Sequence, residues 1–147
     1  MPRPANHAEM TPQEKYEIFK NAYNVLNSYI AEKEFLAAHA LAFSILEDRV
    51  LATRIQCGEI AEGPLNVNIV KNKIPFEKSA NKLIELKVIT KDIHEELIRH
   101  AHERNEFLHQ AMWRLKEFNH QSIIKIRKSI NAVENSRRTF IRSHRVK

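Results

Sequence analysis

The residues best suited to chemistry in this chain of 147 residues are an arginine, an asparagine and a histidine in its second half. Arg104, Asn105 and His109 lie in the run RNEFLH, within a long segment of helical periodicity. A histidine that titrates near neutral pH can transfer protons, and an arginine can bind an anion through two parallel hydrogen bonds. The spacing of the three residues predicts a polar site on one helix.

The three polar residues lie on or at the edge of the apolar face of the same helical segment. At about 100° per residue the apolar side chains span an arc of roughly 100°, and they are Ile93, Leu97, Ala101, Leu108, Ala111, Met112 and Leu115. Arg104 falls inside the arc, and Asn105 and His109 lie at its edge, one turn apart. A guanidinium on a buried face is costly unless an acceptor meets it. We expect Arg104 to pair with an acid on a neighbouring helix, to extend past Leu108 to solvent, or to serve a functional site.

An acidic pair in the first half of the chain is a candidate partner for Arg104. Glu47 falls on the helical face that carries Leu36, Ala40, Phe43 and Val50, with Asp48 beside it and Arg54 two turns on. An inward acid and an inward arginine on neighbouring helices predict a polar network. The spacing does not select Glu47 over Asp48.

Glycine and proline positions divide the chain into helical segments. Both glycines lie between Gly58 and Pro64, and the stretches 13–57 and 76–147 contain neither glycine nor proline. The first helix is expected to begin at Thr11, because Thr11, Pro12 and Glu14 form the pattern of a capping box with proline at the first position. A second helix is expected at about 33–56, with Gly58 as its C-cap.

Three further helices complete the expected fold. Pro75 suits the start of a short helix that ends near Lys87, and Thr90 suits the cap of a long helix that continues through Leu115. After the polar run 119–122, a last helix carries apolar residues from Ile123 to Phe140, and 58–74 is the one irregular connection. The chain therefore reads as an all-α antiparallel bundle of about five helices, a single domain over 1–147 with 1–10 and 143–147 flexible.

Composition excludes several other classes of protein. Two glycines are too few for a many-stranded β fold or for a glycine-rich phosphate-binding loop. The single Cys57 cannot form an internal disulfide, and the first ten residues contain no apolar run of the signal-peptide kind. The longest nearly apolar stretch, 35–46, is shorter than the roughly 18 residues of a membrane span. We expect a soluble, cytoplasmic protein.

In this helical context the run from Arg104 to His109 resembles the R-x4-6-H motif of the HEPN superfamily, the nucleotide-binding domains of higher eukaryotes and prokaryotes. The residue after the arginine is typically polar in that motif, and Asn105 fits the habit. The layout is also similar over residues 33–142, with a bundle of this size, the motif on a late helix and an acid, Glu47 or Asp48, on an earlier one.

The resemblance implies a metal-independent endoribonuclease, often the toxin of a toxin-antitoxin or antiphage system. Such a protein works as a homodimer through its motif-bearing helices. His109 would exchange a proton with the ribose 2′-hydroxyl or the leaving 5′-oxygen, Arg104 would stabilise the phosphate, and Asn105 would orient either. The 2′-hydroxyl attacks, so no cofactor or metal is needed, and the product carries a 2′,3′-cyclic phosphate. An acidic antitoxin or another neighbouring-gene product is an implied partner.

The formal net charge of +6 is concentrated at the end of the chain. Residues 120–147 contain eight Lys or Arg against Glu134 alone, and the preceding part is nearly neutral. The candidate RNA-binding residues of this segment are Lys125, Arg127, Lys128, Arg137 and Arg138. They indicate a cationic approach surface for RNA or, as a plainer interpretation, a solvated helix face.

Two competing interpretations remain open. His102, Glu106 and His109 share a helical face and could bind zinc or iron, although the spacing is not that of H-E-x-x-H. His94 and His100 have no partner pattern and are expected to be exposed.

The alternative to an enzyme is a non-catalytic helical protein that binds nucleic acid or acts as a scaffold. A helix-turn-helix regulator is disfavoured, because no short glycine-containing turn joins two helices.

Overall fold

A computed structural model describes residues 11–63, 74–110, 112–113 and 115–145, and within these ranges the protein is an all-α bundle without strands. Its helices are α1 (Pro12–Ala31), α2 (Phe35–Glu62), α4 (Phe76–Glu85), α5 (Lys91–Gln110) and α6 (His120–Arg145), with a short 3-10 turn, η2 (Leu115–Glu117). The predicted fold class is confirmed. Of the two ends expected to be flexible, residues 143–145 belong to α6, and residues 1–10 and 146–147 lie outside the described part.

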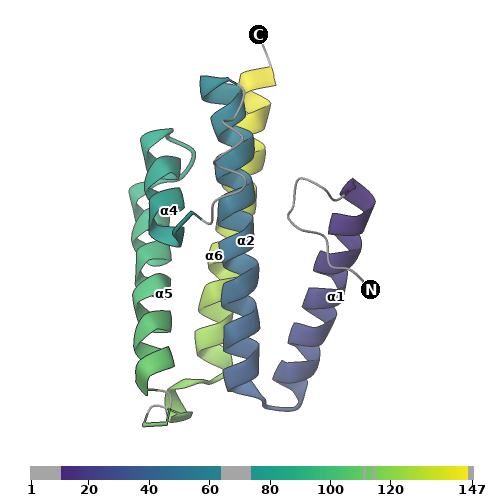
Figure 1. Cartoon of the computed structure of the whole chain (residues 1–147), viewed down its shortest axis with the longest axis vertical. Coiled ribbons are helices and arrows are strands. Elements are labelled where there is room, and N and C mark those ends of the chain that lie inside the picture. The colour runs from purple at the N-terminus through teal and green to yellow at the C-terminus, as the bar shows by residue number, and fades with distance from the viewer. Residues whose placement is uncertain (1–10, 64–73, 111, 114, 146–147) are drawn as a thin grey trace.

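The helix α2 stands at the centre of the arrangement, with α1 on one side and the α4–α5 pair on the other (Figure 1). Consecutive helices run antiparallel in the α1–α2, α4–α5 and α5–α6 pairs, whereas α2 and α6 run in the same direction (Figure 1). The most extensive packing is between α2 and α6. No helix in the described part is long and apolar enough to cross a membrane.

The core forms where α2 meets its neighbours. From α2 it takes Phe43, Leu46 and Val50, and from α6 it takes Ile123, Ile126, Ile130 and Val133, all almost fully buried. The apolar face expected for α2 is wrong at two positions, because Leu36 and Ala40 are exposed. The buried positions centre on Ala38, Ala42 and Leu46 instead, since α2 packs against several helices and not against one.

Two helices end without the glycine that often follows a helix. The turns after these helices therefore do not depend on the two glycines of the chain. Lys33 after α1 and Lys87 after α4 adopt left-handed backbone conformations, with φ of 59° and 62°. After α4, the Lys87 amide donates to the Ile84 carbonyl (3.1 Å) and the Val88 amide donates to the Leu83 carbonyl (2.9 Å). These two bonds define a Schellman motif, and the buried Val88 and Leu83 side chains provide its usual apolar contact.

The predicted boundaries are right at the start of α1 and wrong at the end of α2. The capping box is present, because the Glu14 amide donates to Thr11 Oγ1 (3.1 Å) and the Thr11 amide donates to Glu14 Oε1 (3.4 Å). Gly58 is not a C-cap. It is a buried position inside α2, which continues to Glu62 and ends at Gly63, where φ is 93° and the amide donates to the Glu59 carbonyl.

The helix that carries the motif is shorter than expected. It ends at Gln110, so Met112 and Leu115 do not extend its apolar face and are instead exposed. The chain passes through η2 to the buried Phe118, whose ring packs edge-on against His39 at 5.3 Å between centroids. Asn119 then caps α6 by accepting a hydrogen bond from the Ser122 amide (3.1 Å). Ala111 and the side chains of Phe107 and Leu108 lie outside the described part.

Candidate functional site

Arg104 of α5 is held between α5 and α2 by an acid and an aromatic ring. Its Nη1 atom lies 3.5 Å from Glu47 Oε1, and its Cζ atom lies 4.6 Å from the centroid of the Phe43 ring. Both charged side chains remain partly exposed, Arg104 at 37% and Glu47 at 40%. The structure therefore brings together two residues that are 57 positions apart in the sequence and that periodicity had placed on facing helix surfaces.

Arg104 and Glu47 border a cavity of about 670 Å³ between α2, α4 and α5. Asp48, Glu77 and Asn105 also line this cavity, and Phe76 and Ala101 contribute apolar surface. Two buried polar atoms at its lining residues, Arg104 Nε and Ser79 Oγ, have no hydrogen-bond partner among the described residues. Buried polar atoms are normally satisfied, so this arrangement favours a polar occupant.

Asn105 and His109 are both exposed side chains of α5. Asn105 lines the cavity, and His109 is exposed one helical turn further along. The described lining residues do not include His109. Among the motif residues, Arg104 thus faces the bundle, whereas Asn105 and His109 are accessible from outside.

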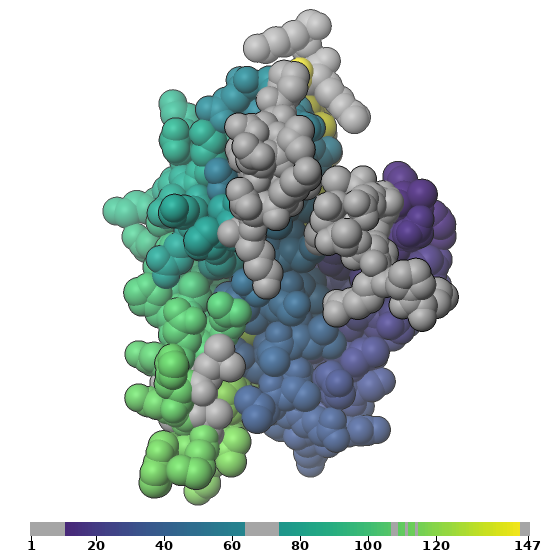
Figure 2. All heavy atoms as spheres, in the orientation of Figure 1, coloured from purple at the N-terminus to yellow at the C-terminus, as the bar shows by residue number. Residues whose placement is uncertain are grey.

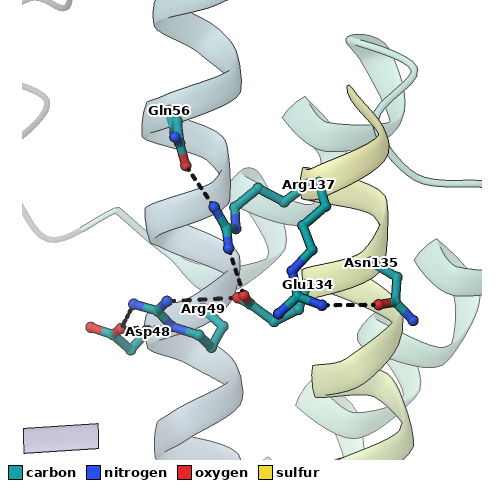
Figure 3. Close-up of polar contacts among 7 residues, drawn as sticks. Asp48, Arg49, Gln56, Glu134, Asn135 and Arg137 are labelled. Atoms are coloured by element: carbon teal, nitrogen blue, oxygen red, sulfur yellow. Dashed lines mark hydrogen bonds and ion pairs between the residues drawn. The ribbon is translucent and has the colours of Figure 1, made fainter. Parts of the chain in front are cut away.

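The two candidate acids, Glu47 and Asp48, pair with different arginines. Glu47 contacts Arg104, whereas Asp48 accepts hydrogen bonds from its neighbour Arg49, at 2.9 Å from Nη2. Arg49 also lies 3.6 Å from Glu134 of α6, and its guanidinium stacks over the Phe19 ring of α1 at 3.9 Å. Figure 3 shows this second polar network, which joins Asp48 and Arg49 of α2 to Glu134 of α6. Glu47 is therefore the acid that pairs with Arg104 among the described residues, whereas Asp48 pairs with Arg49 and also lines the cavity.

Two buried histidines lie near this site, and sequence reasoning missed both. His39 is 4% exposed, and burial, reinforced by the nearby His100, lowers its pKa to about 4. His100, expected to be exposed, is 3% exposed, and its Nε2 lies 2.9 Å from Ser129 Oγ of α6. Burial lowers its pKa as well, although Glu96 acts in the opposite direction. Burial thus disfavours the charged form of both rings, and the sequence gives no local sign of this burial, which arises where α2, α5 and α6 pack together. His94, also expected to be exposed, is half-buried, with Nε2 at 2.7 Å from Asn81 Oδ1.

The candidate RNA-binding residues of α6 divide into two groups. Lys125 and Lys128 are exposed. Arg127 donates to Asn27 Oδ1 of α1 at 3.0 Å, and Arg137 donates to Glu134 Oε2 (2.9 Å) and to Gln56 Oε1 of α2 (3.2 Å). Arg138 is exposed and makes a long contact of 3.5 Å with Asn135 Oδ1. Arg127 and Arg137 therefore also connect helices.

A metal site and a cysteine nucleophile find no support in the described residues. No group of three metal-ligating side chains is assembled in the described part, and His102 lies 3.4 Å from Glu77 of α4. The buried Cys57 thiol has its pKa raised by burial to about 11, so it stays protonated at neutral pH. Comparisons with known protein families, with curated proteins and with solved structures found no match to this chain.

Proposed function

We propose that this protein is a metal-independent endoribonuclease of the HEPN type, with a composite active site formed by two copies of the chain. One observation carries the proposal. Arg104 is fixed by Glu47 and Phe43 at the edge of a cavity, with Asn105 and His109 on the accessible side of the same helix. An anion-binding group and a proton-transfer group thus occupy adjacent turns of α5.

Arg104 is suited to bind a phosphate because its contact with Glu47 is long and uses one donor. A guanidinium has five N–H donors, and in the described part only Nη1 of Arg104 has a hydrogen-bond partner. Glu47 and the Phe43 ring restrict the rotamers of Arg104, while donors remain for the oxygens of a phosphodiester. We assign Glu47 as a positioning residue.

His109 would carry the proton transfers. The ribose 2′-hydroxyl attacks the adjacent phosphorus, the P–O5′ bond breaks, and a 2′,3′-cyclic phosphate and a 5′-hydroxyl are formed. One imidazole accepts the proton of the 2′-hydroxyl, and an imidazolium donates a proton to the leaving 5′-oxygen. Two His109 side chains in a dimer could divide these roles, and Asn105, one turn before His109, would orient the imidazole or a phosphate oxygen.

The charges at the cavity favour a position at its mouth for the proposed RNA substrate. Three carboxylates, Glu47, Asp48 and Glu77, line the cavity of one copy, whereas Arg104 is the one cation among its described lining residues. A phosphate deep in this cavity would be repelled. The phosphate is therefore expected on the exposed α5 surface, where a second Arg104 from the partner copy would add positive charge.

An exposed apolar surface supports the dimer. Shortly after His109, Met112 is 70% exposed, Trp113 81% and Leu115 54%. The α5 side forms one edge of the molecule, distant from α1 (Figure 2). A cluster of large exposed apolar side chains beside a candidate site is typical of an interaction surface. We infer that a second copy covers it, and a strictly monomeric solution mass would contradict this.

The α6 cations would attract RNA or an acidic antitoxin.

The test compares the wild-type protein with His109→Ala on single-stranded RNA in the presence of a chelator. His120→Ala is the matched control, because His120 is also exposed but lies at the start of α6. We expect cleavage by the wild type and the control and a loss of about 100-fold or more in His109→Ala. Equal cleavage by all three proteins would refute the role of His109.

The alternative function is RNA binding without cleavage, favoured by the exposed Lys125 and Lys128. It predicts that the wild-type protein binds the same RNA and leaves it intact. Binding that weakens with rising salt, and that Lys125→Gln with Lys128→Gln reduces, would establish this alternative.

A further inference from the structure

We propose that a second cavity, between the C-terminal halves of α2 and α6, is a binding pocket for a phosphate group. The cavity measures about 330 Å³, and its lining residues are Gln56, Arg137, Arg138, Ile141 and Arg142. Three of these five residues are arginines, and no lining residue in the described part is acidic. The volume is at the lower end of the range of small-ligand sites, about 300–1,000 Å³, and suits a group the size of a single nucleotide.

The floor of the pocket is pre-organised by Arg137. Its guanidinium extends from α6 toward α2, where it donates to Gln56 Oε1, and it also donates to Glu134 Oε2 (Figure 3). Its buried Nε has no hydrogen-bond partner among the described residues. Glu134 also lies 3.6 Å from Arg49, which Asp48 pairs with at 2.9 Å, so these two acids balance Arg49 and Arg137. The positive charge of the pocket therefore comes from the two other arginines of its lining, Arg138 and Arg142.

Two arginines at the rim are available to a ligand. Arg138 and Arg142 are four residues apart, so their side chains lie one turn above each other on α6. Both are exposed, and Arg138 is engaged by a long contact of 3.5 Å with the neutral Asn135. Arg142 makes no ion pair with a described residue. Planar guanidinium groups match the oxygen geometry of a phosphate, which distinguishes this pocket from a general cationic surface.

This pocket is separate from the Arg104 site. Gln56 follows Glu47 by nine residues, and at about 100° per residue this spacing places them on opposite sides of α2. The inference goes beyond the proposed cleavage and does not depend on it. A phosphate could come from a free nucleotide or from the backbone of an RNA chain, and the experiment distinguishes these sources.

The test measures binding of adenosine 5′-monophosphate, adenosine and a labelled single-stranded RNA oligomer to the full chain. The variant Arg138→Gln with Arg142→Gln removes the rim, and Lys78→Gln with Lys91→Gln is the control, which removes two positive charges from α4 and α5. We expect binding of a phosphate-bearing probe to fall at least about tenfold in the rim variant, to change less than about twofold in the control, and to be absent with adenosine.

The probe that responds identifies the source of the phosphate. If binding of adenosine 5′-monophosphate falls in the rim variant, the pocket is assigned to a free nucleotide. If only binding of the oligomer falls, the pocket is assigned to the RNA backbone, and the slope of log K against log salt should be smaller by about 1.4 in the rim variant than in the wild type. Failure of all phosphate probes to bind at millimolar concentration, or equal losses in the rim and control variants, would overturn the proposal. All proteins in this experiment also carry His109→Ala, so the proposed cleavage does not consume the oligomer, and failure of the proposed cleavage would not affect the result.

Discussion

The stability of this protein should depend on pH through its buried histidines. His39 has a pKa of about 4 in the folded protein, against 6.5 for an unperturbed histidine, because burial disfavours the imidazolium. Below pH 6.5 the unfolded chain binds a proton that the folded protein does not bind. The contribution of the neutral, buried His39 to the free energy of unfolding is therefore complete above pH 6.5. It is lost as the pH falls toward 4 and is absent below that pH.

The size of this effect follows from the shift. One pKa unit corresponds to about 1.4 kcal/mol, so His39 contributes about 2 kcal/mol between pH 7 and pH 5, and about 3 kcal/mol once the pH reaches 4. His100, whose pKa is also lowered by burial, adds to the loss in the same direction. For a chain of this length, 2 kcal/mol corresponds to a fall in Tm of about 4–8 °C.

The assay is urea unfolding at pH 7 and pH 5, followed by circular dichroism. The variant His39→Phe removes the titrating group while keeping a ring against Phe118, and His120→Gln, at an exposed position, is the control. We expect the loss of unfolding free energy between the two pH values to shrink by about 2 kcal/mol in His39→Phe and to be unchanged in the control. An unchanged pH dependence in His39→Phe would refute the burial argument.

Three substitutions at helix ends and interiors should change stability in opposite directions, measured by thermal or urea unfolding. Gly58→Ala should stabilise by about 0.5–1 kcal/mol, because a Cβ at this helical position meets nothing within 4 Å; destabilisation would mean that the helix packs more tightly there. Gly63→Ala should destabilise by about 1–3 kcal/mol, since its φ of 93° and ψ of −170° suit glycine alone. Lys87→Gly should stabilise by about 1 kcal/mol by relieving a left-handed lysine, and no gain would contradict the strain inferred at Lys87.

The helices could be predicted because their signals are local. The capping box at Thr11 and the repeat of apolar side chains at three or four residues act within one or two turns. The end of α5 could not be predicted in the same way, because neither glycine nor proline interrupts the chain after Phe76. Beyond Gln110 the chain turns back and buries Phe118 against His39, a contact between residues far apart in the sequence that no local pattern specifies.

The sequence predicted which face of each helix carries the site residues, but it did not predict which side chains contact one another. Periodicity placed Arg104 and Glu47 inward, and the structure pairs them at 3.5 Å. It could not distinguish Glu47 from Asp48, because Glu47 contacts Arg104 of the neighbouring helix α5 whereas Asp48 pairs with the next residue of its own helix, Arg49. The burial of His100 was missed for a related reason, since its partner Ser129 lies 29 residues away on α6. Such contacts depend on the relative rotation of helices, which no local pattern specifies.

The most direct test of the proposed ribonuclease is the chemistry of its product ends. Single-stranded RNA is incubated with the wild-type protein and a chelator, and the fragments are analysed by mass spectrometry. The account predicts fragments that end in a 2′,3′-cyclic phosphate and begin with a 5′-hydroxyl, because the attacking group is the 2′-hydroxyl of the substrate. Intact RNA, or fragments with 3′-hydroxyl and 5′-phosphate ends, would contradict it.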